Sequence, residues 1–220
     1  MADSIVSRRR SPRRVAELAT GAGGVLLVVL GGVLLARLVH DAPLGLDSTW
    51  ARAMTADRTA QGVAMATALA TIGGTLVTSL LTVAVGATLL ILRQWRTAIV
   101  LIVTVALTSG ASSLMKVLVA RPRPPGGLLT LSSLSYPSGH ATTAAALVAV
   151  LVMALPRVWT WALGVVWVLV IAWSRTYLGV HWLTDVAAGA VLGASIALLV
   201  HGAVALVGVN DEVNGPSRMA

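Results

Sequence analysis

The sequence predicts an all-α membrane protein, a single bundle of six transmembrane helices with one short interfacial helix. Three observations support this fold class. Hydrophobic residues make up 57% of the 220 residues and charged residues only 11%, whereas a soluble domain carries about 25% charged residues. The mean hydropathy is +0.88. Apolar stretches close to the ~20 residues that cross a bilayer recur along the chain.

The first apolar stretch, residues 18–39, is rich in glycine and leucine. It is longer than the 7–15 residues of a signal peptide's apolar region, and no clear small-residue cleavage site follows it. We therefore interpret it as a retained first span. Residues 41–60, which include Trp50 and Arg52, are amphipathic. They suit a short helix that lies in the headgroup layer.

The next apolar stretch, residues 62–92, is too long for one perpendicular crossing. We expect Gly73-Gly74 to divide it into an interfacial approach and a membrane-crossing part. The four later spans are predicted at residues 97–119, 138–156, 158–173 and 181–207.

Charge placement predicts the orientation. The chain carries a net charge of +8, and five arginines lie between positions 8 and 14. We interpret this cluster as a cytoplasmic anchor beside anionic lipid rather than as a nucleic-acid site. The turn at Arg93 and Arg96, together with Arg157, falls on the same side. Both termini are therefore expected in the cytoplasm, with the 121–137 and 174–185 loops on the outer face of the membrane. The predicted division is a basic tail at 1–17, a membrane domain at 18–208 and a disordered tail at 209–220.

Residue types limit the chemistry. The chain has no cysteine, which excludes a disulfide framework and a thiolate metal site. Only two histidines and one acidic residue fall in the outer loops, so we expect neither a metal ion nor another cofactor.

Polar groups gather instead at the outer ends of the predicted spans. Ser138 is a good helix N-cap after Pro137, and the free N–H groups of such a helix terminus favour an anion. His140, in the first turn of this helix, can donate or accept a proton near neutral pH. Lys116 and Arg175 end two other spans.

The residue types and their spacing suggest a chemical role for each of these groups. Lys116, Arg123 and Arg175 offer cationic donors suited to phosphate oxygens. His181 and Asp185 are four residues apart, so on a helix they share one face. A carboxylate that holds one imidazole nitrogen leaves the other as an oriented nucleophile or base. The set is typical of phosphoryl transfer through a histidine.

Read together, these residues form a three-part signature that is similar to that of the type 2 phosphatidic acid phosphatase superfamily, the integral-membrane lipid phosphate phosphatases. The resemblance covers residues 116–185, and each part keeps the order and spacing of the family. The parts are Lys116 with Arg123-Pro124, Pro137-Ser138-Gly139-His140, and Ser174-Arg175 with His181 and Asp185.

The resemblance implies a metal-independent phosphatase. His181 would attack phosphorus and form a phosphohistidine, oriented by Asp185, and His140 would protonate the leaving oxygen. The phosphate oxygens would be held by Lys116, Arg123, Arg175 and the backbone of Ser138 and Gly139. Arg121 repeats the arginine-proline pair, which leaves two candidates for one phosphate contact, and the six-residue gap after Lys116 favours Arg123.

Several alternatives remain open on the sequence. The preferred substrate is polyprenyl (undecaprenyl-type) pyrophosphate, because the site faces outward. Phosphatidylglycerophosphate, phosphatidic acid and diacylglycerol pyrophosphate are the others. A lipid or anion transporter and a non-catalytic lipid-binding member of the same fold are the competing functions. His181 with Asp185 could be a buried structural pair, and Lys116 could extend to the interface from its helix end.

Two further patterns are noted. Gly189 and Gly193 are spaced for close helix packing within the bundle. His40 and His201 fit no motif and receive no role.

Overall fold

The computed structural model describes residues 12–38, 43–56 and 58–214, and their regular structure is entirely α-helical. The all-α class is confirmed. The helices in these ranges are α1 (Pro12–Leu38), α2 (Gly45–Ala56), α3 (Ala60–Ile72), α4 (Thr75–Ile91), α5 (Trp95–Val119), α6 (Gly139–Ala154), α7 (Val158–Tyr177) and α8 (Leu183–Asn214).

Four of these helices, α1, α5, α7 and α8, are long and apolar enough to cross a membrane. Helices α3 and α4 pass the same test only as a pair, bent by 42° at Gly73 and Gly74, where the sequence predicted a division. Helix α6 is apolar but has only 16 residues. By length and composition the described chain therefore has four spans, or five with the bent pair, and the expected count of six depends on α6.

Several helix ends differ from the predicted boundaries, and α7 continues to Tyr177, past the predicted end at 173. Helix α1 begins at Pro12, inside the segment predicted as a tail, and Glu17 pairs there with Arg13 at 3.3 Å. Proline suits the first position of a helix because its missing N–H would have no partner there. Helix α8 continues to Asn214, past the predicted end at 207.

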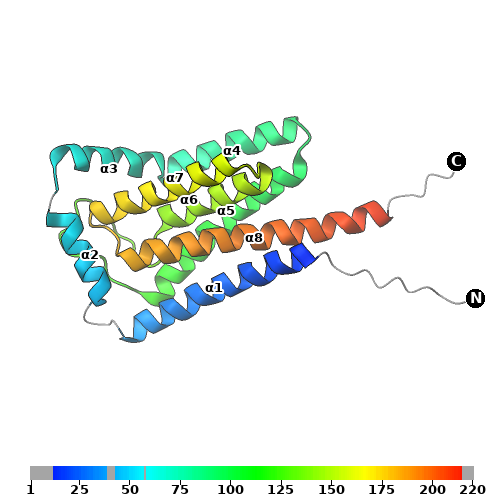
Figure 1. The fold of residues 1–220 in the computed structure, drawn as a ribbon. Helices are drawn as coiled ribbons and strands as arrows, with labels where there is room; N and C mark the ends of the chain where they lie inside the picture. The colour runs from blue at the N-terminus through cyan, green and yellow to red at the C-terminus, as the bar shows by residue number, and fades with distance from the viewer. Residues whose placement is uncertain (1–11, 39–42, 57, 215–220) are drawn as a thin grey trace, which may run out of the picture.

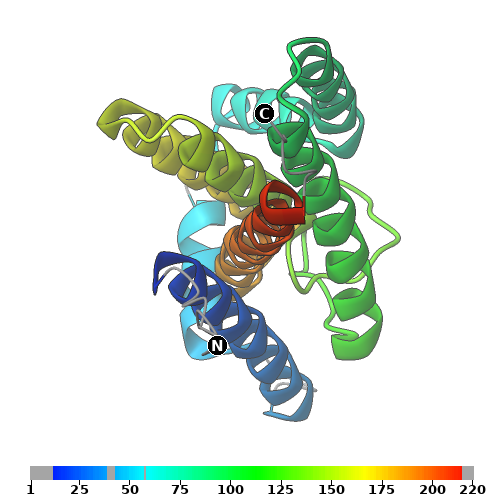
Figure 2. The same ribbon diagram turned by 90° about the vertical axis from the view of Figure 1, so that its right-hand side faces the viewer.

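Helix α8 lies at the centre of the packing, between α1 and α6 (Figures 1 and 2). Its contact with α6 needs glycine. A Cβ on Gly193 would lie 2.0 Å from the Thr142 carbonyl oxygen, and one on Gly189 would lie 2.6 Å from that of Ser138. The prediction that these glycines serve close packing within the bundle is confirmed.

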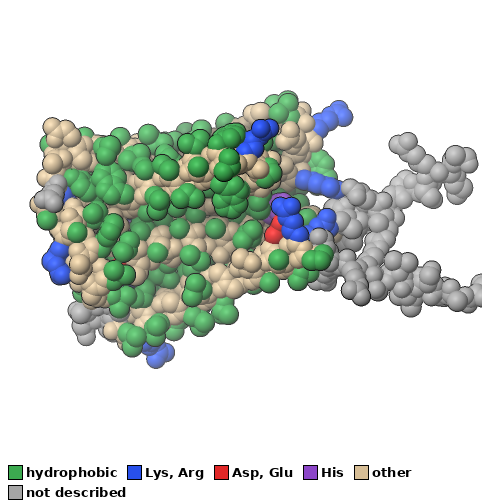
Figure 3. Space-filling model, viewed as in Figure 1, with side chains coloured by type: hydrophobic (Ala, Val, Ile, Leu, Met, Phe, Trp, Pro, Cys, Tyr) green, Lys and Arg blue, Asp and Glu red, His purple; other side chains and the backbone are tan. Residues whose placement is uncertain are grey.

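The two ends of the bundle differ. At one end α2 lies across the bundle, beside the end of α7 and the start of α8 (Figure 1). Helix α1 begins and α8 ends at the other. Leucine and valine side chains cover much of the lateral surface, whereas most lysines and arginines lie towards the ends (Figure 3). His201 contacts Glu17 at 2.9 Å near the second end, and His40 lies outside the described residues.

Helix α1 also reaches the motif that precedes α6. The Tyr136 hydroxyl donates to the Val28 carbonyl at 2.7 Å. A Cβ on Gly32 would lie 2.8 Å from the Tyr136 ring. The ring is 2% exposed, so α1 holds the residue next to Pro137 in place.

Candidate active site

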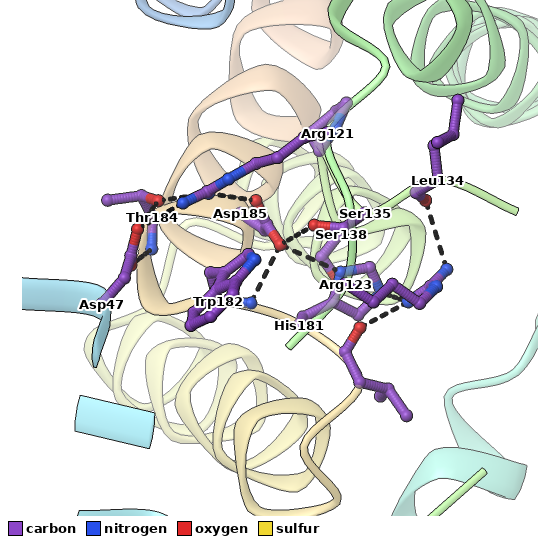
Figure 4. A network of polar contacts seen from close by, with 12 residues as sticks. Asp47, Arg121, Arg123, Leu134, Ser135, Ser138, His181, Trp182, Thr184 and Asp185 are labelled. Atoms are coloured by element: carbon purple, nitrogen blue, oxygen red, sulfur yellow. Dashed lines mark hydrogen bonds and ion pairs between the residues drawn. The ribbon is translucent and has the colours of Figure 1, made fainter. Parts of the chain in front are cut away.

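Segments far apart in the sequence meet at the α2 end of the bundle (Figure 4). Lys116 lies in the last turn of α5, Arg175 in the last turn of α7 and Asp185 in the first turn of α8. The loop between α5 and α6 brings Arg123 to His181, with 3.2 Å between Arg123 Nη1 and His181 Nε2. Helix geometry therefore brings Lys116, Arg123, Arg175, His181 and Asp185 to the same end of the bundle, as the sequence predicted.

His181 lies in the turn before α8 and is 4% exposed. Burial lowers its pKa to about 4, so its imidazole is neutral near pH 7. Arg123 Nη1 can only donate, which places the lone pair of His181 on Nε2 and its proton on Nδ1. Nδ1 is 3.5 Å from Asp185 Oδ2, and this long approach leaves it without a hydrogen bond in the described part of the chain.

Asp185 is fully buried and its carboxylate accepts several hydrogen bonds. Arg121 Nη1 donates to Oδ1 at 2.6 Å. The Ser135 hydroxyl and the Trp182 backbone N–H both donate to Oδ2, the latter at 2.9 Å. These donors favour the ionised carboxylate and fix its direction. Asp185 can therefore hold the His181 ring in one orientation.

Arg121 is buried and links two carboxylates, those of Asp47 and Asp185. Its Nη2 donates to Asp47 Oδ2 at 2.6 Å, while Nη1 reaches Asp185. Asp47 also accepts from the Thr184 backbone N–H at 2.9 Å and from the Thr184 hydroxyl at 2.8 Å. The side chains of Arg121 and Asp47 are 4% and 0% exposed. Both charges are thus paired inside the protein, and Arg121 does not line the cavity described below.

Arg123 has a different environment. Its guanidinium donates to the Ser133 carbonyl at 2.7 Å, to the Ser133 hydroxyl at 3.0 Å and to the Val180 carbonyl. These contacts join the α5–α6 loop to the turn that carries His181. Burial lowers the pKa of Arg123, and no carboxylate is paired with it in the described part of the chain. Of the two arginines, Arg123 is the one that lies beside the imidazole.

Arg175 is the least satisfied charge of the site. It is 2% exposed, its Nε has no hydrogen-bond partner, and the described residues offer it no ion pair. Lys116 Nζ donates to two backbone carbonyls, those of Leu134 at 2.8 Å and Pro137 at 2.9 Å. A buried cation without a counter-charge is costly, so these groups call for an anion from outside.

A cavity of about 250 Å³ opens beside these groups, between α4, α5 and α6. It combines cations, two imidazoles and many hydroxyls, and no acidic side chain lines it among the described residues. The predicted site residues that line it are Lys116, Arg123, Gly139, His140, Arg175 and His181.

The start of α6 contributes unevenly to the cavity. Gly139 and His140 line it, whereas Ser138 does not. The Ser138 backbone N–H donates to the Asp185 carbonyl at 3.0 Å, and its buried hydroxyl has no partner. His140 Nε2 lies 3.1 Å from the Ala70 carbonyl oxygen of α3, which holds the ring at the edge of the cavity.

Reasoning from the sequence missed Asp47 and left Arg121 without a role. Asp47 lies in the first turn of an amphipathic helix, where an acidic residue is ordinary. Its partner Arg121 is 74 residues away, so no local spacing marks the pair. The repeated arginine-proline pair was the one available signal. Among the described residues no three histidine or acidic side chains gather as metal ligands.

Comparison with known proteins places these residues in a family. The model of the PAP2 superfamily matches residues 97–207, half of the chain. An undecaprenyl-diphosphatase of Sulfolobus acidocaldarius is 43% identical over 65 residues, 30% of this chain and 31% of that protein. A decaprenylphosphoryl-5-phosphoribose phosphatase of Mycobacterium tuberculosis is 45% identical over 94 residues, 40% of this chain and 50% of that one. The alignments thus span at most half of these relatives.

A solved structure extends the likeness. A transmembrane PAP2-type phosphatidylglycerolphosphate phosphatase from Bacillus subtilis matches with a TM-score of 0.70 and 25% identity. The match covers 87% of this chain and 98% of that one, so it extends over helices that precede the matched family segment. On the family model, the three-part signature and this fold, the chain belongs to the PAP2 superfamily.

Proposed function

We propose that this protein is a phosphatase that removes a phosphate group from a membrane lipid. The observation that carries the proposal is Arg175, a buried guanidinium that has no counter-charge within residues 12–38, 43–56 and 58–214. It lies beside a cavity that Lys116 and Arg123 also line. A phosphate ester or anhydride would supply the missing charge and accept bidentate hydrogen bonds. The exposed apolar flanks of the helices would admit the lipid tail from the side.

His181 is the proposed nucleophile. Its Nε2 attacks phosphorus while the bond from phosphorus to the leaving oxygen breaks, and the product is a phosphohistidine. The imidazole becomes positively charged, and its Nδ1–H then faces the carboxylate of Asp185, which stabilises the charge. Water attacks the phosphohistidine in a second step, which releases inorganic phosphate and restores the neutral ring.

His140 is the proposed acid. In its protonated form it gives a proton to the leaving oxygen, and in the second step it takes one from the attacking water. Lys116, Arg123 and Arg175 stabilise the charge that develops on the phosphate oxygens. Gly139, at the first turn of α6, lines the same cavity, where the helix terminus favours an anion. Because protein groups fill each role, the reaction is proposed to need no metal ion.

The first candidate substrate is a polyprenyl pyrophosphate of the undecaprenyl type, supported by the name of the Sulfolobus relative. Phosphatidylglycerophosphate is the second, supported by the name of the Bacillus phosphatase with the similar fold. Phosphatidic acid is a third. The proposed location is the plasma membrane of a bacterium, with the site on the extracytoplasmic face and the termini in the cytoplasm. Positive charge at the end where α1 begins supports this orientation.

A transporter would need polar groups along the whole membrane depth. In the described residues the charged side chains of the cavity gather at one end of the bundle, which favours the phosphatase.

The test is phosphate release by the detergent-purified protein, with EDTA present, from each candidate lipid. We expect His181→Ala to lower turnover by about 10⁴-fold or more. Acid-quenched wild-type protein should carry label from ³²P-substrate, and His181→Ala should carry none. Normal turnover by His181→Ala would refute the assignment of the nucleophile. Thr88→Ala, far from the cavity on α4, is the matched control and should retain full activity.

A further inference from the structure

The wall of the cavity below the cations is lined with hydroxyl groups. Ser112 and Ser113 lie one turn from Lys116 on α5, and Thr108 and Ser109 lie one turn further. Residues three and four apart share one face of a helix. The hydroxyls of α5 therefore form a stripe that faces the cavity. From Lys116 to Thr108 the stripe extends about 12 Å at 1.5 Å per residue.

The facing wall has the same character. The first turns of α4 contribute Thr75, Thr78 and Ser79, and α6 contributes Thr143. These three residues follow directly after the 42° bend between α3 and α4. Hydroxyls therefore face the cavity from three helices.

Hydroxyls in membrane helices commonly bond to their own backbone, and some here do. Thr78 donates to the Gly74 carbonyl at 2.8 Å and Thr108 to that of Thr104 at 2.9 Å. Ser79, Ser109 and Ser113 make no such bond in the described part of the chain.

Ser112 gives the strongest evidence that a ligand binds to this wall. It is 4% exposed, and its buried hydroxyl has no hydrogen-bond partner among the residues described. A buried polar group without a partner costs free energy. The cavity therefore offers hydroxyls that are free to bond to a ligand.

The rest of α5 shows that this polarity is local. Leu107, Leu114 and Leu118 are exposed on other faces of the helix. The cavity on the α1 side of α5 is lined by Leu35, Leu118 and other mostly apolar residues. A lipid tail needs only such apolar walls, and hydrocarbon packed against free hydroxyls would leave them unpaired.

We propose that this hydroxyl-lined wall, on α4 and α5, binds a hydroxyl-bearing spacer, a sugar or a glycerol unit, that carries the reacting phosphate and links it to the lipid. The inference rests on the proposed phosphatase function and narrows its substrate class. It ranks phosphatidylglycerophosphate and lipid-linked sugar phosphates above the polyprenyl pyrophosphate that the name of the Sulfolobus relative places first. Phosphate monoesters of lipid-linked polyols use the wall. A prenyl pyrophosphate, which has no hydroxyl next to the reacting phosphate, does not.

The experiment compares kcat/KM for three lipids: a prenyl pyrophosphate, phosphatidylglycerophosphate and a prenylphosphoryl-ribose phosphate. The variant replaces Ser79, Ser109 and Ser113 together by alanine. We expect its preference for the hydroxylated lipids over the pyrophosphate to fall by about tenfold or more, because several hydrogen bonds are lost. The two hydroxylated lipids show whether sugar or glycerol is bound. Thr88→Ala should leave the preference unchanged.

Three results would overturn the proposal. The first is a triple variant whose ratio of kcat/KM, hydroxylated lipid over pyrophosphate, stays within twofold of the wild-type ratio. The second is an equal loss of kcat/KM for all three lipids. The third is a wild-type protein with a higher kcat/KM for the pyrophosphate than for the hydroxylated lipids. Wild-type protein that releases phosphate from none of the lipids would overturn the proposed function as well. Thermal unfolding in the same detergent identifies a variant that has lost its fold, and single Ser109→Ala and Ser113→Ala variants then replace it.

Discussion

The two sides of His181 differ in how their charges are satisfied. Behind the ring, Asp185, Arg121 and Asp47 form a buried chain in which each charged group has a partner at 2.6 Å. In front of it, among the residues that the structure describes, Arg175 has no counter-charge and Lys116 donates hydrogen bonds only to backbone carbonyls. The paired groups behind the ring can fix its orientation in the absence of a ligand, whereas the cations in front of it need an anion to balance their charge.

This difference indicates a division of labour. A nucleophile is most effective when its orientation is fixed before the substrate arrives. Donors aimed at the phosphate are most effective when no protein group neutralises them. Substitutions behind the ring should therefore act mainly on stability and orientation, and those in front mainly on catalysis and anion binding.

The largest expected effect on stability comes from Asp47→Ala. The change removes one of the two carboxylates beside Arg121 and leaves the Thr184 backbone N–H and hydroxyl without their acceptor. Each unsatisfied donor costs about 1–3 kcal/mol. Thermal or denaturant unfolding in a fixed detergent measures the loss. Thr55→Ala on the same helix, an exposed residue bonded to its own backbone, should change stability by less than about 0.5 kcal/mol. An Asp47→Ala protein as stable as wild type would remove the distinction between the two sides.

Arg175→Met tests the front side. We expect kcat/KM for phosphate release to fall by about 10²–10³-fold, the range for losing one donor to the transition state. The unfolding temperature should be unchanged or higher, because an unpaired buried charge is removed. Inorganic phosphate should stabilise the wild type, by about 2.7 kcal/mol at 100 times its dissociation constant, and stabilise Arg175→Met much less. A marked loss of stability in Arg175→Met would contradict the contrast.

The smallest effect is in the titration of His181, where the two sides meet. Burial lowers its pKa to about 4, below the ordinary 6.5. Between these values the unfolded chain binds the proton and the folded chain does not, so stability falls as the pH falls through this window. Histidine NMR of the labelled protein, assigned with His181→Gln, should show a midpoint near pH 4. A midpoint of 6 to 7 would show that the ring is not desolvated.

The fold was predictable where apolar runs are continuous. Helices α1, α5, α7 and α8 follow from such runs, and the Gly73-Gly74 break follows from the excess length of one of them. The start of α1 was placed too late, because Arg13 and Arg14 read as tail, and the contact between Arg13 and Glu17 is visible only once the helix exists. The short α6 shows why spans cannot be counted from hydropathy alone.

The site was predictable where membrane topology fixes depth. Four of its residues lie at helix ends on one side of the bundle, so the backbone alone brings them close together, whichever rotamers their side chains adopt. They are Lys116, His140, Arg175 and His181. The pairing of Asp47 with Arg121 depends instead on how α2 lies across the bundle. The use of the Ser138 N–H by the Asp185 carbonyl likewise depends on the contact between α6 and α8. Neither leaves a mark in residue spacing.

Tyr136 and Asp47 have a consequence for how the protein could be divided. All signature residues lie within the family segment, residues 97–207, yet Tyr136 is anchored to α1 and Arg121 to α2. A fragment that begins at residue 97 would keep every signature residue but lose the contacts of Tyr136 with α1 and of Arg121 with α2. Helices α1 and α2 are thus a structural part of the unit that contains the candidate site. Grafting the signature segment onto another membrane anchor would require a new partner for each contact.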